Sequence, residues 1–115
     1  AILDEENLEE PFERSGTRLV MSHEWCYHFD EIIKKYPEAW IQLIYREDST
    51  SYNWWKQAGG FDITYPDYSW YQDDETMFFK IYEQNQLILD FAQKHVLQWT
   101  QHHKHNDIFI AVYKP

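Results

Sequence analysis

Pro37 separates two segments in which the apolar residues are spaced differently. Before it, five large apolar side chains recur at intervals of three or four residues, and so share one face of a helix: Trp25, Phe29, Ile32, Ile33 and Tyr36. The Ser22 hydroxyl is suited to cap the first turn, and a proline disfavours helical geometry in the residue before it. The pattern therefore predicts a helix from Ser22 to Tyr36.

After Pro37, apolar residues alternate over residues 39–46, and the polar segment Glu47–Ser51 ends the run. This spacing predicts a strand, and a helix that begins at Pro37 is the alternative. Similar patterns predict the other elements: a short strand at 17–21, a strand at 60–65 before Pro66, a helix from Asp73 or Asp74 to about Lys104, and a strand at 107–113. The segment between residues 47 and 59 is expected to be a connecting loop.

The expected element order is β-α-β-β-α-β. The simplest arrangement that buries the apolar faces is two helices on one face of a small, mostly antiparallel sheet, and a ferredoxin-like layout has this order. We therefore expect an acidic N-terminal arm at residues 1–16 and a single α+β domain at residues 17–115. Many unrelated functions occur on such a layout, so the fold alone predicts no activity.

The charge of the chain limits its partners. It has 115 residues with 20 acidic and 10 basic side chains, a net charge of −10. This charge disfavours binding to nucleic-acid backbones and to anionic membranes, and favours a basic protein partner. The alternative is that the excess of carboxylates serves only solubility.

A single cysteine, Cys26, cannot form an intramolecular disulfide, which favours a reducing compartment. No apolar run approaches membrane-spanning length, and no signal-peptide pattern is present. These observations predict an intracellular protein, cytoplasmic or nuclear, with no membrane partner.

Motifs for catalysis are weak. The segment His23–His28 resembles a zinc-protease helix, but its histidines are five residues apart and cannot both reach one metal. Cys26 adjoins the apolar face of the first helix, so we expect a buried, inert thiol. The Gly59-Gly60 pair precedes an expected strand rather than a helix, so no phosphate-binding loop is indicated. The sequence predicts no catalytic residue and no cofactor.

The strongest candidate for a metal site is a group of histidines near the end of the chain: His95, His102, His103 and His105. On a continuous helix, His95 and His102 would share a face but lie about 10.5 Å apart along the axis. One ion cannot join them without other ligands. A metal-dependent enzyme built on these residues is therefore the weakest of three functional hypotheses.

The segment from residue 47 to 75 is unusual because it combines many aromatic rings with seven acidic residues and one base, Lys56. Aromatic side chains are common anchors of protein interfaces, and carboxylates attract basic partners. The predicted anchors are Trp54, Trp55, Trp70 and Tyr71, with Tyr52 and Tyr68 beside them, and the predicted steering carboxylates are Glu47, Asp48, Asp67, Asp73 and Asp74.

These residues predict a non-catalytic recognition domain that binds a basic protein, as an inhibitor, an immunity-type protein or a nucleic-acid mimic would. The second hypothesis is an aromatic cage for a cationic small ligand such as a methylated nucleotide. A non-functional alternative assigns the rings of this segment to the core alone.

Overall fold

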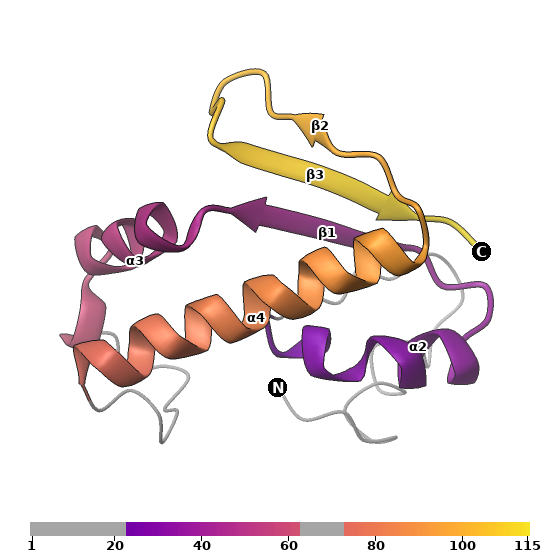
Figure 1. The fold of residues 1–115 in the computed structure, drawn as a ribbon, viewed down its shortest axis with the longest axis horizontal. Helices are drawn as coiled ribbons and strands as arrows, with labels where there is room; N and C mark the ends of the chain where they lie inside the picture. The colour runs from indigo at the N-terminus through magenta and orange to yellow at the C-terminus, as the bar shows by residue number, and fades with distance from the viewer. Residues whose placement is uncertain (1–22, 63–72) are drawn as a thin grey trace, which may run out of the picture. The chain divides into compact units, whose positions relative to one another are not determined.

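The computed structural model describes residues 23–62 and 73–115, which contain three α-helices and a three-stranded antiparallel sheet (Figure 1). This confirms a small α+β fold. The chain divides into two compact units. Residues 23–39 lie in the first and Trp40–Lys114 form the second, and each unit is described by itself.

In the described part of the first unit, a 3-10 helix, η2 (His23–His28), continues into α2 (Phe29–Lys35). The predicted helix is thus confirmed over these residues, with a tighter first part. Cys26 and Phe29 are buried, and the Cys26 thiol donates to the backbone carbonyl of His23 at 3.2 Å. Cys26 therefore has the buried packing position that the sequence predicts.

The second unit is built on a sheet with the strand order β1-β3-β2: β1 (Ile41–Arg46), β2 (Thr100–Gln101) and β3 (Ile108–Tyr113). The predicted strands at 39–46 and 107–113 are confirmed. β1 and β3 are antiparallel, with Leu43 opposite Ala111, and both side chains are only 2 % exposed. Alternation from this pair places one face of both strands in the core.

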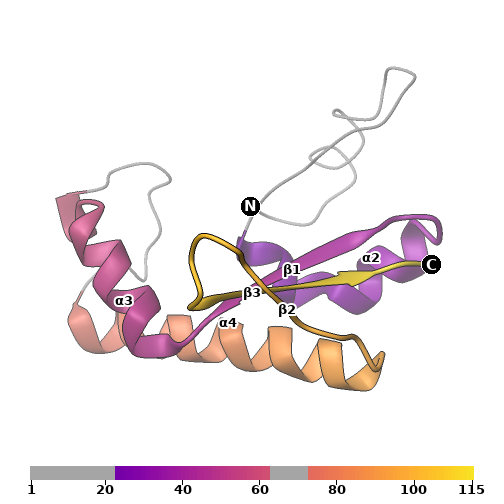
Figure 2. The same ribbon diagram turned by 90° about the horizontal axis from the view of Figure 1, so that it is seen from above.

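Helix α4 (Asp74–Lys94) runs alongside the sheet and packs against β1 (Figures 1 and 2). Its start is confirmed, because Asp73 accepts the Thr76 N–H at 2.7 Å as an N-cap residue. Phe91 on α4 is buried and contacts the Tyr113 ring, with the two centroids 5.5 Å apart. The core of this unit is therefore the interface between α4 and the sheet.

The predicted end of α4 at Lys104 is wrong, because the helix stops at Lys94. Val96 adopts a positive φ of 53°, its N–H donates to Gln93, and the Leu97 N–H donates back to Ala92. These two bonds form a Schellman C-terminal motif. The residues after this turn form β2 and the hairpin that leads to β3.

Residues expected to form a loop are instead helix α3 (Asp48–Gln57), which packs against α4. Glu47 caps α3 by accepting the N–H groups of Ser49 and Thr50, each at 3.0 Å. These two bonds satisfy donors that the first helical turn leaves free, so the polar segment that was expected to end a strand begins a helix.

The predicted strand at 60–65 is wrong over residues 60–62, which form the 3-10 helix η3 (Gly60–Asp62). Gly59 and Gly60 have φ values of 134° and 54°, which turn the chain rather than extend it. Residues 63–65, like the expected strand at 17–21 and the boundary at 16/17, lie outside the described residues.

The predicted β-α-β-β-α-β order, and with it the ferredoxin-like layout, is therefore wrong. The described residues follow the order α2, β1, α3, α4, β2, β3. Helix α3 replaces the expected loop, residues 60–62 form η3 rather than the start of a strand, and strand β2 precedes the last strand. Among the described residues, no helix combines the length and the hydropathy needed to cross a membrane.

Candidate functional site

The structure places seven of the eleven predicted recognition residues. Glu47, Asp48, Tyr52, Trp54 and Trp55 belong to α3 or its cap, and Asp73 and Asp74 begin α4. The other four, Asp67, Tyr68, Trp70 and Tyr71, lie outside the described residues.

Four rings meet where α3, η3 and α4 come together, and we call this group the aromatic cluster: Tyr52, Trp55, Phe61 and Phe78. The Tyr52 centroid lies 5.8 Å from that of Trp55 and 5.7 Å from that of Phe78. Trp55 and Phe61 make an edge-to-face contact at 4.8 Å. Such ring contacts contribute stability beyond that of burying the rings, so this cluster helps to hold α3 against α4.

Lys56 lies over the aromatic cluster. Its ammonium is 5.7 Å from the Tyr52 centroid and 5.5 Å from that of Phe61, and 3.0 Å from an Asp74 oxygen. The hydrogen bond from Tyr52, together with that from Lys56, lowers the pKa of the Asp74 carboxyl. The same carboxylate raises the pKa of both the Tyr52 hydroxyl and the Lys56 ammonium. The arrangement is a cation held by two rings and a carboxylate.

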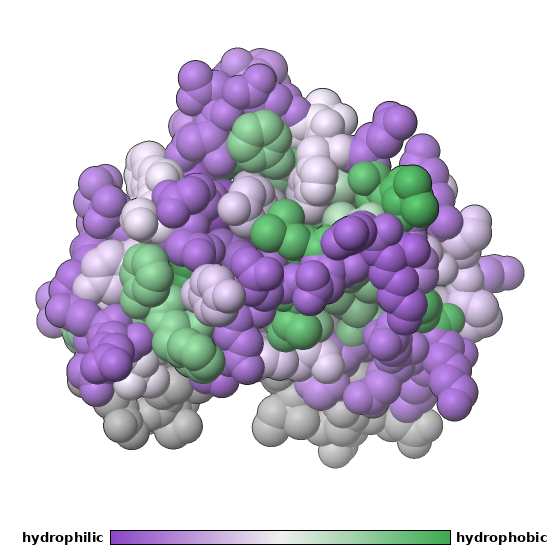
Figure 3. Space-filling model, viewed as in Figure 1, coloured by the Kyte–Doolittle hydropathy of each residue, from purple (hydrophilic) through white to green (hydrophobic). Residues whose placement is uncertain are grey.

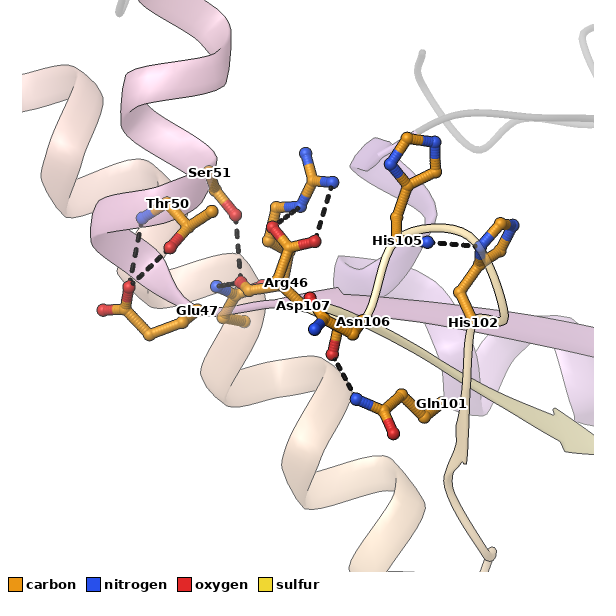
Figure 4. A network of polar contacts seen from close by, with 10 residues as sticks. Arg46, Glu47, Thr50, Ser51, Gln101, His102, His105, Asn106 and Asp107 are labelled. Atoms are coloured by element: carbon orange, nitrogen blue, oxygen red, sulfur yellow. Dashed lines mark hydrogen bonds and ion pairs between the residues drawn. The ribbon is translucent and has the colours of Figure 1, made fainter.

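Trp54 lies apart from the aromatic cluster, because residues two positions apart on a helix, such as Tyr52 and Trp54, do not share a face. Its ring is 48 % exposed and stands 5.0 Å from the Arg46 guanidinium carbon. Arg46 in turn forms an ion pair with Asp107, with 3.0 Å between Nε and the nearer oxygen (Figure 4). Of the adjacent tryptophans, Trp54 is the one available to a partner, while Trp55 is packed.

Two predicted steering carboxylates are also helix caps. Backbone N–H groups lower the pKa of the Glu47 carboxyl at the start of α3 and of the Asp73 carboxyl at the start of α4. Both side chains remain exposed, and a capping bond from a neutral N–H does not cancel the charge. They therefore still contribute to the negative field of this surface.

Asn85 is a residue that the sequence reasoning missed. It is buried in α4 and its amide donates to the Arg46 carbonyl at 2.9 Å and to the Asp48 carboxylate at 2.7 Å. The available signal was its position, because Asn85 fills the gap in the apolar stripe between Ile81 and Ile88. A polar residue at a core position indicates a specific hydrogen-bonded contact.

Exposed rings on α4 were also missed. Phe79 and Tyr82 are 58 % and 46 % exposed, and their centroids are 6.5 Å apart. Figure 3 shows separate small hydrophobic patches in a mostly hydrophilic face, one of them over the N-terminal half of α4. Exposed aromatic rings are therefore also present beyond residue 75.

The four histidines do not act as one group. His95 packs between Phe91 and Tyr113, with centroids 4.4 Å and 5.0 Å away. His102 lies in the β2–β3 loop, where its Nδ1 accepts the N–H groups of Lys104 and His105 (Figure 4). Within residues 23–62 and 73–115, no three His, Cys, Asp or Glu side chains are arranged to hold a metal ion.

The His102 ring also stacks on His103, with centroids 5.0 Å apart, and lies 5.3 Å from His105. The geometry supports a role for His102 in shaping its loop.

Comparison with known proteins gives no match to this chain among family models, curated proteins or solved structures.

Proposed function

We propose that this protein is a non-catalytic recognition domain that docks a basic protein through the acidic, aromatic-rich surface of residues 47–75. The observation that carries the proposal is Trp54, a half-exposed ring beside Arg46 in the segment of residues 47–75, which has seven acidic side chains and one base. A large aromatic side chain supplies contact area at low entropic cost, and the carboxylates favour encounter with a cationic surface. Inhibitors, immunity-type proteins and nucleic-acid mimics use such surfaces on basic targets.

The chain supplies its own matched controls for this proposal. Trp40 is 66 % exposed on the segment before β1, outside residues 47–75, while Trp55 is packed in the aromatic cluster. Trp54→Ala, Trp40→Ala and Trp55→Ala therefore remove the same side chain from a candidate interface, from another exposed position and from a packed one.

We expect Trp54→Ala to weaken binding at least about tenfold, because it deletes an anchor, with stability changed by no more than about 1 kcal/mol. Trp55→Ala should lower stability by about 2 kcal/mol through lost packing. The measurement is capture from lysate of the source cells with elution by rising salt, then titration of the purified partner. A partner that is not basic, or one that binds the Trp54 and Trp40 variants equally, would contradict the proposal.

A second candidate is the aromatic cage for a cationic ligand, and the Lys56 ammonium over Tyr52 and Phe61 favours it. The metal-dependent enzyme has no comparable support in the part of the chain that the structure describes. Zinc that raises the unfolding temperature of the wild type but not of a His102→Asn variant would revive it.

A further inference from the structure

The surface proposed to bind a basic partner already holds a basic side chain of its own. Lys56 belongs to the last turn of α3, and Asp74 is the first residue of α4. The ammonium reaches Asp74 at 3.0 Å and stands over the rings of Tyr52 and Phe61. The contact between Lys56 and Asp74 joins residues that are 18 positions apart in the chain.

The three groups around Lys56 are those that recognise an alkylammonium or guanidinium ion. The ring faces attract a cation through their quadrupoles, and the carboxylate supplies the opposite charge. The Tyr52 hydroxyl, next to Asp74, also lowers the pKa of this carboxyl and so favours its ionised form. The position is open to solvent, because the Lys56 and Asp74 side chains are 44 % and 63 % exposed.

We infer that Lys56 is an internal occupant of a cation-binding site formed by Tyr52, Phe61 and Asp74, and that a lysine or arginine side chain of the basic partner replaces it on docking. This inference rests on the proposed function. Lys56 can leave because an exposed ion pair and an exposed cation–π contact each hold a flexible side chain only weakly. The incoming cation meets the same rings and carboxylate, so the site exchanges one cation for another.

The test compares two lysines that differ in their surroundings. Lys56→Ala removes the internal occupant, whereas Lys80→Ala removes one charge from α4, where Lys80 pairs with Glu83 at 3.4 Å. The probe is butylammonium chloride at constant ionic strength, and the readout is the shift of the Tyr52 and Phe61 ring protons in NMR spectra.

We expect Lys56→Ala to be half-saturated at a concentration about fivefold lower than the wild type, because the competing ammonium is gone. Lys80→Ala and Lys56→Arg should behave as the wild type. Adding Asp74→Asn to Lys56→Ala should abolish saturable binding. Equal gains in the Lys56→Ala and Lys80→Ala variants would show a general charge effect and overturn the inference.

The inference and the proposed function fail in different ways. If a basic partner depends on Trp54 but Lys56→Ala gains no affinity for butylammonium, the docking surface stands and the cation site is lost. If Lys56→Ala binds butylammonium but no basic partner exists, the site belongs to a small-ligand protein and the docking proposal is wrong. Butylammonium that leaves the ring protons of the Lys56→Ala variant unmoved would overturn the inference outright.

Discussion

One buried amide connects three elements of the second unit. Asn85 on α4 bonds the last residue of β1 and the first residue of α3, so it fixes the corner at which the strand becomes a helix. The Arg46 carbonyl that it contacts also accepts the Ser51 hydroxyl at 2.9 Å (Figure 4). Because buried polar groups are costly without partners, this network favours a single arrangement of the corner.

Asn85→Leu should therefore lower the free energy of unfolding by about 1–3 kcal/mol, since it keeps a similarly branched side chain and removes both donors. Asn85→Asp should cost more, because it faces the Asp48 carboxylate with a second negative charge. The measurement is urea unfolding at neutral pH. The control is Asn53→Leu, at an exposed position of α3, which should change stability by less than about 0.5 kcal/mol. Equal effects at positions 53 and 85 would refute a structural role for the buried amide.

At the scale of the element, the end of α4 is held in a conformation that suits glycine better than the residue present. Val96 is β-branched, 86 % exposed and at a φ of 53°. The left-handed region costs an L-residue about 1–2 kcal/mol. The exposed Val96 side chain offers little packing energy to offset this cost. The two backbone bonds of the Schellman motif maintain this turn despite the strain.

We therefore expect Val96→Gly to stabilise the protein by about 1 kcal/mol, because the relief of strain exceeds the entropy that glycine adds to the unfolded chain. Thermal and urea unfolding both measure this change. Val96→Ala serves as the comparison, since it removes the branch while keeping a Cβ atom, and should gain less. Destabilisation by glycine would mean that the Val96 side chain makes contacts that outweigh the strain.

The start of α3 depends on an ionised side chain, which makes it sensitive to acid. Hydrogen bonds from Ser49 and Thr50 lower the pKa of Glu47 below its ordinary value of 4.5. A carboxyl with a lowered folded-state pKa contributes stability above its unfolded value, and loses it as the pH falls through the folded value. The contribution of Glu47 is thus present at neutral pH and disappears in acid.

Glu47→Gln should consequently lower the urea midpoint at about pH 7, and its effect should shrink as the pH falls through the lowered folded-state pKa, because the wild-type carboxyl then also becomes neutral. Ser51→Ala, which removes a hydroxyl that does not titrate in this range, is the control for a pH-independent loss. A gap between wild type and Glu47→Gln that stays constant from neutral to acidic pH would argue against an ionised cap.

At the scale of the whole molecule, the sequence predicts elements with a clear apolar period or a common cap, but not those that depend on an unusual cap, an unusual turn residue or a tertiary contact. Alternation predicts β1 and β3, and the Asp73 cap predicts the start of α4. These features are set by residues close together in the chain. They need no knowledge of what packs against them.

Helix α3 was missed because its sequence contains Ser49, Thr50, Ser51 and Asn53, which favour caps and turns over helix interiors. Its stability comes from Glu47 and from the contact with α4, neither of which is a periodic signal. The end of α4 was missed because valine is rarely found at a left-handed turn. In the candidate site, composition indicates an excess of rings and carboxylates, but it does not indicate that Lys56 lies over two of the rings and pairs with Asp74.

The register of the sheet has a consequence for how the second unit is made. Ile41 near its beginning pairs with Tyr113 near its end, and β3 lies between the other two strands. During synthesis, neither β1 nor β2 can pair until β3 has been made, because β3 is the strand that both of them pair with. Helices α3 and α4 can form before that. The unit should therefore fold late and as a whole, with its aromatic surfaces open to chaperones until the last strand arrives.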